Sequence, residues 1–270
     1  MTGLSLNQET IKQWSLPELA KGCVAAEVRG VGLWRAPVQE YGPEAAGRLL
    51  RDAGLTVTSL CRGGFFTASD AGERTAALED NRRAIDEAVA VGTDVLVLVS
   101  GGLPAGSRDL HGARERIADA LAELAPYARE RGVRLAIEPL HPMYASDRCV
   151  VSTLAQALDL AERFPADAVG VVVDTYHLWW DDTIAAQIAR AGERIAAFQL
   201  ADWVTPLPEG VLLGRGQLGD GSVDFRWFRE QVEAAGYTGW TEVEIFNPGL
   251  WARDGAEVLG EIIERYRTVL

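Results

Sequence analysis

The feature that most constrains the fold is an alternation of two kinds of segment along the whole chain. Short runs rich in apolar and β-branched residues are each followed by a longer run rich in Ala, Leu, Glu and Arg at helical spacing. Strands that alternate with helices form parallel sheets. We expect strands near residue 5 and at 24–30, 55–61, 93–102, 133–140, 168–174, 194–202 and 240–246, and helices at 16–23, 43–54, 72–92, 109–132, 153–164, 183–193, 224–236 and 255–270.

Eight strand–helix units in 270 residues predict a single α/β domain, a (β/α)8 or TIM barrel over residues 1–270. No low-complexity segment or Pro/Ser-rich linker divides the chain. The alternative is an open, doubly wound sheet, but neither GxGxxG nor GxxxxGK(S/T) follows the first expected strand. The glycine pairs at 63–64 and 101–102 are typical of turns. The closed barrel is therefore the favoured architecture.

Composition excludes several classes of partner. The formal net charge is −13, which argues against nucleic acid or an anionic membrane surface as the main partner. No apolar run is long enough to span a membrane, and the first residues lack the apolar core of a signal peptide. Cys23, Cys61 and Cys149 are scattered, with no CxxC pair, so neither a zinc ribbon nor a disulfide framework is indicated. We expect a cytoplasmic protein with reduced thiols.

Polar side chains end the apolar runs of the last four expected strands. They are Glu138, Asp174, Gln199 and Glu244, and barrel enzymes place catalytic groups at this end of the strands. One such acid often caps a helix or pairs with an arginine, but three acids and one amide on four consecutive strands need a shared cation. Hard oxygen ligands favour Mn²⁺, with Mg²⁺ or Co²⁺ as alternatives, over Zn²⁺. Glu242 competes with Glu244, because residues two apart share a strand face.

Two of the three histidines follow the proposed ligands. His141 and His177 each lie three residues after one of them, so both are expected in loops above the metal, where an imidazole can move a proton. Orientation of the metal ligands is the alternative role. His111 opens a charged helix and is expected on the surface. Arg215 stands between glycines, where it either binds a substrate oxyanion, carboxylate or phosphate or faces solvent.

Aromatic residues are frequent near the expected strand ends. Flat apolar rings suit the C–H faces of sugars and aromatic aglycones, and they also suit a partner chain. We expect Trp34 and Trp179 to contact the substrate; the other members of this set are Phe65, Phe66, Trp180, Trp203 and Trp251.

The order and spacing of Glu138, Asp174-xx-His177, Gln199, Arg215 and Glu244 resemble the xylose-isomerase-like barrel superfamily, often called sugar phosphate isomerases/epimerases. The resemblance runs over nearly the whole chain and is clearest at 133–251. It implies one divalent metal, bound by side chains from successive strands, and proton transfer next to the carbonyl of a keto sugar or cyclic polyol. It also favours Glu244 over Glu242 as the ligand.

Gln199 departs from the family, whose isomerases and epimerases usually have histidine there. Glutamine resembles the lyase side, such as dehydroshikimate dehydratases. The stretch IEPLHPMYASDR resembles the large subunit of bacterial C-glycoside deglycosidases, which cleave 3-oxo-glucosyl C-glycosides with a small β-type partner. This resemblance implies that His141 is the base and that His177 or Arg215 steadies the oxyanion.

The leading hypothesis is thus a metal-dependent lyase that acts on an oxo-sugar, as a C-glycoside deglycosidase, with a small glycoside substrate and either a β-type partner subunit or a homo-oligomer. The alternative is a sugar or sugar phosphate isomerase/epimerase. An apurinic endonuclease uses a related barrel, but three histidines and a charge of −13 disfavour it. A non-catalytic scaffold predicts no bound metal.

Overall fold

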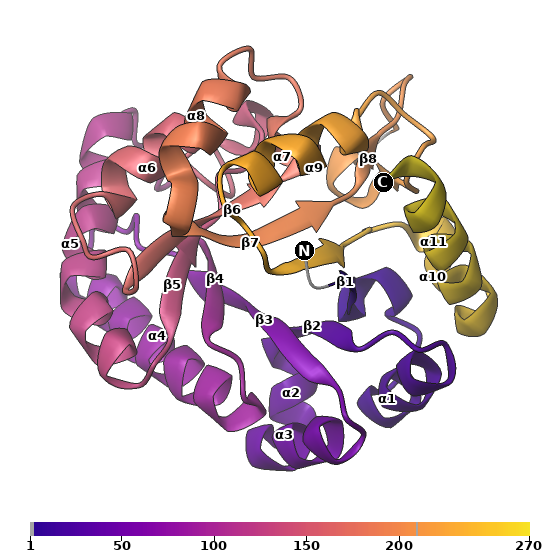
Figure 1. Cartoon of the computed structure of the whole chain (residues 1–270). Helices are drawn as coiled ribbons and strands as arrows, with labels where there is room; N and C mark the ends of the chain where they lie inside the picture. The colour runs from indigo at the N-terminus through magenta and orange to yellow at the C-terminus, as the bar shows by residue number, and fades with distance from the viewer. Residues whose placement is uncertain (1–2, 209) are drawn as a thin grey trace.

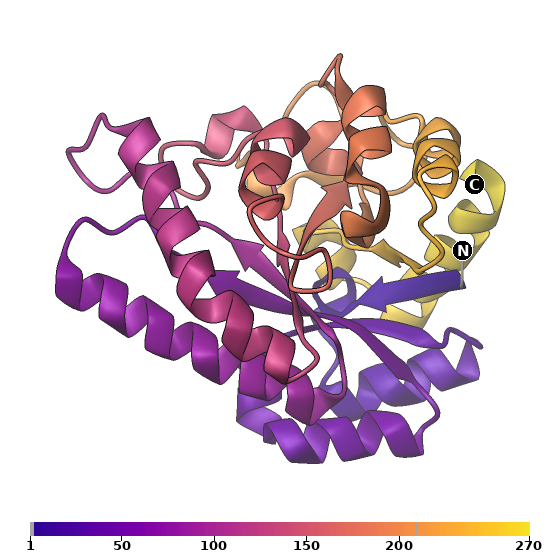
Figure 2. The same ribbon diagram turned by 60° about the vertical axis from the view of Figure 1, so that its left-hand side comes forward.

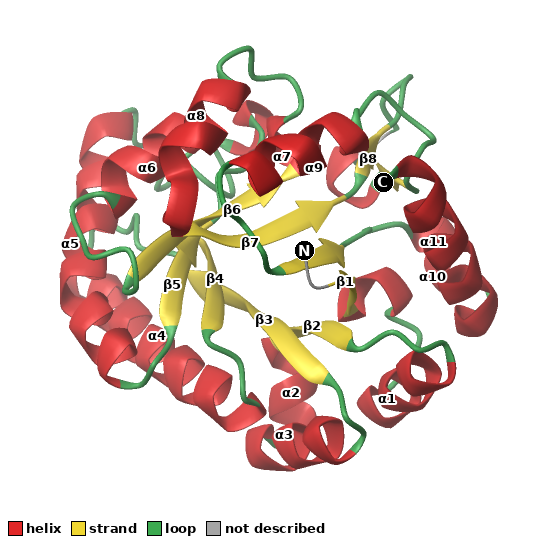
Figure 3. Cartoon of the chain, in the orientation of Figure 1, coloured by secondary structure: helices red, strands yellow, loops and turns green. Residues whose placement is uncertain are grey.

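The computed structural model describes residues 3–208 and 210–270, so Met1, Thr2 and Glu209 of the expected single domain lie outside the description. Eight parallel strands of the described chain close into a barrel in the order β1-β10-β7-β6-β5-β4-β3-β2 (Figures 1 and 3). The expected α/β barrel is confirmed. Its strands are β1 (Gly3–Asn7), β2 (Gly30–Trp34), β3 (Thr56–Gly64), β4 (Val95–Val99), β5 (Arg134–Ile137), β6 (Val169–Asp174), β7 (Ile195–Leu200) and β10 (Trp240–Val243).

Helices surround the barrel on the outside, as both ribbon views show (Figures 1 and 2). Their apolar faces pack on the strands and form one large core. The α-helices are α1 (Leu16–Ala25), α2 (Arg35–Tyr41), α3 (Pro43–Asp52), α4 (Ala71–Val91), α5 (Leu110–Glu130), α6 (Leu154–Ala161), α7 (Thr175–Leu178), α8 (Ile184–Ala191), α9 (Phe225–Ala234), α10 (Pro248–Trp251) and α11 (Gly255–Val269), and the 3-10 helices are η1 (Gln8–Ile11), η2 (Pro142–Tyr144), η3 (Gly192–Arg194) and η4 (Val211–Leu213).

One expected strand is wrong. Residues 24–30 do not form the second strand: α1 continues to Ala25, and β2 begins at Gly30. The sequence GVGLW has a low strand propensity because two of its five residues are glycines. The barrel interior requires one of them, since a Cβ on Gly32 would lie 2.5 Å from the carboxyl carbon of Glu242. Packing against this buried acid therefore overrides propensity.

Short elements missing from the sequence-based prediction shape the mouth of the barrel. After β7 the chain forms β8 (Asp202–Trp203), which pairs antiparallel with β9 (Arg215–Gly216). Asp202 fixes the chain that follows β9, because its carboxylate accepts hydrogen bonds from the backbone N–H groups of Gly219, Gly221 and Val223 over 2.8–3.0 Å. The pairing of β8 with β9 places Arg215 over the carboxyl ends of the barrel strands.

The three cysteines of the chain are free and buried. None of the described helices is both long and apolar enough to cross a membrane.

Candidate metal centre and active site

The strand ends bring the four sequence-predicted ligands to one rim of the barrel. Glu138 lies one residue beyond β5, Asp174 is the last residue of β6, Gln199 lies in β7, and Glu244 lies one residue beyond β10. Asp174 and Gln199 are direct partners in the parallel register. All four side chains are buried. Burial of three acids so close together is costly unless cations compensate them.

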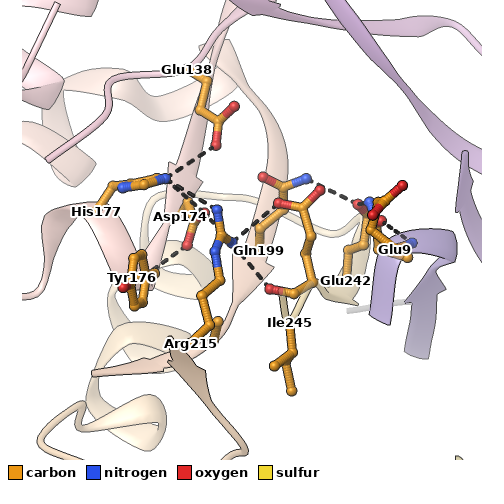
Figure 4. Close-up of polar contacts among 12 residues, drawn as sticks. Glu9, Glu138, Asp174, Tyr176, His177, Gln199, Arg215, Glu242 and Ile245 are labelled. Atoms are coloured by element: carbon orange, nitrogen blue, oxygen red, sulfur yellow. Dashed lines mark hydrogen bonds and ion pairs between the residues drawn. The ribbon is translucent and has the colours of Figure 1, made fainter. Parts of the chain in front are cut away.

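Glu138, Asp174 and His177 form the tightest group of this cluster. One donor atom from each lies within 4.8 Å of the other two. His177 Nε2 lies 3.7 Å from Asp174 Oδ2 and 3.9 Å from Glu138 Oε1 (Figure 4). His177 lies in the short helix α7, which starts directly after Asp174. The structure therefore places the imidazole of His177, expected to move a proton or to orient the metal ligands, where it could itself join Glu138 and Asp174 in binding a cation.

Arg215 occupies the centre of the site and does not face solvent, since it is only 3 % exposed. Its Nη1 lies 3.2 Å from Asp174 Oδ2 and 3.2 Å from Glu244 Oε2, and it also donates to the carbonyl oxygen of Glu244. The rings of Tyr176 and Phe246 lie 4.8 and 4.6 Å from the guanidinium carbon. Arg215 thus bridges the acids of β6 and β10 within an aromatic clamp.

Glu242 has a different role from Glu244. The strand pattern alone could not separate the two, and the family resemblance favoured Glu244 as the ligand. Its carboxylate accepts four hydrogen bonds inside the barrel, all of 2.8–2.9 Å, from Asn7 Nδ2, Gln199 Nε2, Thr58 Oγ1 and Ser59 Oγ. These bonds satisfy both oxygens. A carboxylate can only accept hydrogen bonds, so Gln199 must turn the NH2 group of its amide toward Glu242 (Figure 4).

The donors that remain fit a divalent cation. Gln199 Oε1 and Glu244 Oε1 are buried and have no hydrogen-bond partner among the described residues. A buried oxygen without a partner is costly, and two of them, one on the amide and one on a carboxylate of this acidic cluster, indicate that a bound cation would complete the site. The set consists of carboxylate and amide oxygens with one imidazole, which suits Mn²⁺, Mg²⁺ or Co²⁺. A divalent metal is therefore indicated, and its identity stays a prediction.

Burial controls the protonation of the acids. It raises the pKa of Glu244 to about 8, with the neighbouring Arg215 opposing the shift. Burial and the charges of Glu244 and Asp174 raise the pKa of Glu138 well above its usual value. The pKa of Asp174 is also raised by burial, against the pull of Arg215. A cation that binds all three would reverse these shifts.

His177 is held neutral by its surroundings. Burial and the charge of Arg215 lower its pKa well below the usual value. Its Nδ1 accepts the backbone N–H of His141 over 3.2 Å, and Arg215 Nη2 lies 3.2 Å from its Nε2. Both ring nitrogens thus face N–H donors, which disfavours the imidazolium.

His141 lies beside the cluster but outside the lining of the cavity. Its ring stacks on Trp203 with the centroids 4.8 Å apart. Burial lowers its pKa, so the ring is neutral near pH 7. Its Nδ1 accepts the backbone N–H of Met143 over 3.3 Å, a long bond that places the ring proton on Nε2.

A cavity of about 260 Å³ opens above the cluster, lined by the site residues Glu138, His177, Arg215 and Glu244. Trp34, expected to contact the substrate, lines this cavity, and its Nε1 donates to Asn7 Oδ1. Trp179 is not part of the lining and packs on Trp203, with the ring centroids 5.7 Å apart. Sequence reasoning missed other lining residues, because their runs carry no motif: Glu9, Lys12, Cys61, Arg62, Val99, Leu140, Arg148, Leu212, Leu213 and Phe246.

Comparison with solved structures supports the fold over the full length. Protein SMc04130 from Sinorhizobium meliloti 1021 is 47% identical and superposes with a TM-score of 0.96, covering 99% of this chain and 98% of that one. The IolI protein with a bound zinc atom is 19% identical, with a TM-score of 0.84 and coverage of 98% and 97%, which shows a shared fold.

Among curated proteins, the 3-dehydroshikimate dehydratase of Pseudomonas aeruginosa is 32% identical over 246 residues, which is 88% of this chain and 37% of the dehydratase. The inosose isomerase of Bacillus subtilis is 26% identical over 145 residues, 52% of this chain and 50% of the isomerase. The chain thus spans little more than a third of the dehydratase relatives. The model of the xylose isomerase-like TIM barrel family matches residues 20–262. With its eight-stranded barrel, this chain belongs to that family.

Proposed function

We propose that the chain is a divalent-metal-dependent lyase that removes the proton next to the ketone of a cyclic oxo-sugar or keto-polyol and then expels a substituent from the β-carbon. The single observation that carries this proposal is the unpartnered amide oxygen of Gln199 beside the buried acids. An amide ligand resembles the lyase side of the family, and the 32% identical relative is named as a dehydratase, which is a lyase.

Glu138, Asp174, Gln199 and Glu244 would hold the ion, with the imidazole of His177 at its edge. When bound, a divalent ion supplies Lewis-acid polarisation of a carbonyl and offsets charge that develops on its oxygen. The ionised site carries three negative charges, on Glu138, Asp174 and Glu244. Arg215 supplies one positive charge, so a further cation is needed to balance them.

His141 serves as the proton acceptor in this proposal: its backbone N–H donates to Nδ1 of the cavity-lining His177, which places it beside the site, and its lowered pKa keeps it neutral. To accept a proton at Nε2, His141 must adopt the tautomer that carries its ring proton on Nδ1. The long hydrogen bond from the backbone N–H of Met143 to Nδ1 breaks when this tautomer forms. The electron pair of the broken C–H bond moves toward the ketone oxygen, whose charge the guanidinium of Arg215 steadies. The pair then returns to form the C=C bond, the β-substituent leaves with its bonding pair, and the imidazolium of His141 protonates it.

The most specific form of the proposal is cleavage of a 3-oxo-glucosyl C-glycoside, supported by the resemblance of IEPLHPMYASDR to deglycosidase large subunits. That form requires a small β-type partner or a homo-oligomer, and the exposed side chains of Trp180, Leu207 and Leu213 near the mouth offer apolar area for either. The free cysteines support action in the reducing cytoplasm.

A second candidate is an isomerase or epimerase of a free or phosphorylated keto sugar, since several relatives are named inosose isomerase. It shares the first proton transfer, and only the fate of the β-substituent separates the two reactions.

The test uses the Mn²⁺-loaded chain in deuterium oxide with a 3-oxo C-glucoside, 3-dehydroshikimate, inosose and free ketoses. The proposal predicts release of the aglycone or of water from one of them, at a rate reduced about 10²–10⁴-fold in His141→Asn. His111→Asn is the matched control, because His111 is exposed on α5 as expected. Deuterium uptake with every substituent retained would establish the isomerase, and no reaction with any member would refute both.

A further inference from the structure

A second charged feature borders the cavity, opposite in sign to the acidic cluster. Besides Arg215, three cationic side chains line the cavity: Lys12, Arg62 and Arg148. The whole chain carries a net charge of −13, so a concentration of cations at this one opening is unexpected from composition. Cations at a cavity rim raise the local concentration of anionic ligands and bind them.

Two of these cations already have acidic partners. Lys12 Nζ lies 3.2 Å from Glu9 Oε2 and 4.9 Å from the ring centroid of Trp251. Arg148 Nε lies 3.7 Å from the carboxylate of its neighbour Asp147. Their charges are partly offset by the protein itself.

Arg62 is different. Within residues 3–208 and 210–270, its guanidinium forms no ion pair within 4.0 Å and donates no hydrogen bond, and it lies beside two rings: the guanidinium carbon is 4.5 Å from the centroid of Phe65 and 5.9 Å from that of Trp34. Its positive charge also acts on the carboxyl group of Glu138 from a longer distance. Rings beside the guanidinium restrict its plane without using its N–H groups, so five donors stay available.

Arg62 borders the same cavity as the ligand-bearing strand ends. It belongs to β3, which in the closed order of eight strands stands two places from β5, followed by Glu138, and four places from β7, which carries Gln199. A ligand in the cavity can therefore contact Arg62 and the acidic cluster at once, since Arg62, Glu138 and Glu244 all line it. The cavity measures about 260 Å³, which gives room for one small ligand.

We propose that Arg62 is the binding site for an anionic group, a carboxylate or a phosphate, on the substrate. This inference rests on the proposed function, because the acidic cluster must bind the ketone end of the same molecule. It narrows the substrate class to acidic keto-polyols or phosphorylated keto sugars, ahead of neutral oxo-glycosides. A planar fork that carries two parallel N–H groups matches either anion in a bidentate geometry.

The experiment measures binding with paired probes that differ only in charge. The Mn²⁺-loaded chain is titrated calorimetrically with 3-oxocyclohexanecarboxylate and its neutral carboxamide, and with fructose 6-phosphate and fructose. The anionic member of at least one pair binds about tenfold more tightly, as expected for a charge-assisted bidentate contact. The pair that shows the preference identifies the anion as a carboxylate or a phosphate.

Substitutions assign the preference to a residue. In Arg62→Gln the anionic and neutral members bind alike, and Arg62→Met, which keeps an apolar stem against Phe65, is the second variant. Lys12→Gln removes the same charge from the same rim but from a side chain already paired with Glu9, so it keeps most of the preference. Arg62 donates no side-chain hydrogen bond within the described protein, and its contacts with two rings contribute about 0.5–1 kcal/mol, so its replacement lowers the melting temperature by only a few degrees.

Two outcomes overturn the inference: no preference for either anion in the wild-type chain, or an equal preference in both Arg62 variants. The same titrations without probe report Mn²⁺ binding. Failure to bind Mn²⁺ contradicts the proposed function, whereas Mn²⁺ binding without an anion preference contradicts only the role of Arg62.

Discussion

Gln199 Nε2 donates a hydrogen bond of 2.9 Å to Glu242 Oε1, and this bond leaves the amide oxygen of Gln199 free beside the acidic cluster. Glu242 is itself fixed by three other donors, so the orientation of the amide is set from inside the barrel. Carboxylates that orient a metal ligand in this way affect metal affinity although they do not touch the ion.

The first prediction concerns Glu242. Glu242→Leu leaves the amide of Gln199 without its acceptor, so we expect Mn²⁺ affinity to fall about 10–100-fold by calorimetry. Glu242→Gln keeps most of the affinity, because the hydroxyls of Thr58 and Ser59 can accept from the new amide.

Thr58→Val is the control for a general loss of stability. It removes a bond to the other oxygen of Glu242 and costs about 1 kcal/mol of stability, while Mn²⁺ affinity stays unchanged. Wild-type affinity in a folded Glu242→Leu protein would show that the Gln199 amide needs no such support.

Arg215 and the metal compensate the same acids, so their effects on stability are coupled. Arg215→Met removes the cation that bridges Asp174 and Glu244, and we expect the metal-free protein to lose about 3–5 kcal/mol of unfolding free energy. Mn²⁺ restores a large part of this loss. Denaturant unfolding with EDTA and with Mn²⁺ measures both values, and an equal loss under the two conditions would contradict the coupling.

The stabilisation by metal increases with pH. Folded Glu138, Asp174 and Glu244 have raised pKa values, so above the ordinary carboxyl range the folded chain binds more protons than the unfolded chain. The metal-free protein therefore loses stability as pH rises, until Glu244 deprotonates near its pKa of about 8. Metal binding requires the deprotonated acids, so it offsets this loss.

Thermal melting with and without Mn²⁺ tests this sign. The increase in melting temperature on adding Mn²⁺ should grow from about pH 6 to about pH 8. An increase that shrinks over this range would mean that the acids are not the groups that bind the ion.

The strands that the sequence located well are those with β-branched runs, such as 168–174 for β6 (Val169–Asp174). Their polar ends also located Glu138 and Asp174, because an acid after a buried run has few structural explanations. The position of β2 was mispredicted because the glycine at position 32 is required by the side chain of Glu242, which leaves no room for a Cβ there. The two residues are 210 positions apart, so no local sequence pattern contains this contact.

The site residues outside the strands were harder to place. Arg215 reaches the cluster only because β8 and β9 pair, and two-residue strands leave no periodic signal. Trp179 was expected against the substrate, yet whether a loop tryptophan turns toward the cavity or toward Trp203 depends on tertiary packing. Arg62 follows β-branched and apolar residues without any motif, and its lack of a partner is visible only in three dimensions.

The metal content of the purified chain tests the central claim most directly. After all metal is removed and the protein is dialysed against Mn²⁺, elemental mass spectrometry should find one manganese ion per wild-type chain. The double variant Glu138→Gln and Glu244→Gln keeps the shape of both side chains and should bind Mn²⁺ at least about a hundredfold more weakly. A wild-type chain that retains no ion, or a double variant that retains as much as the wild type, would contradict the account.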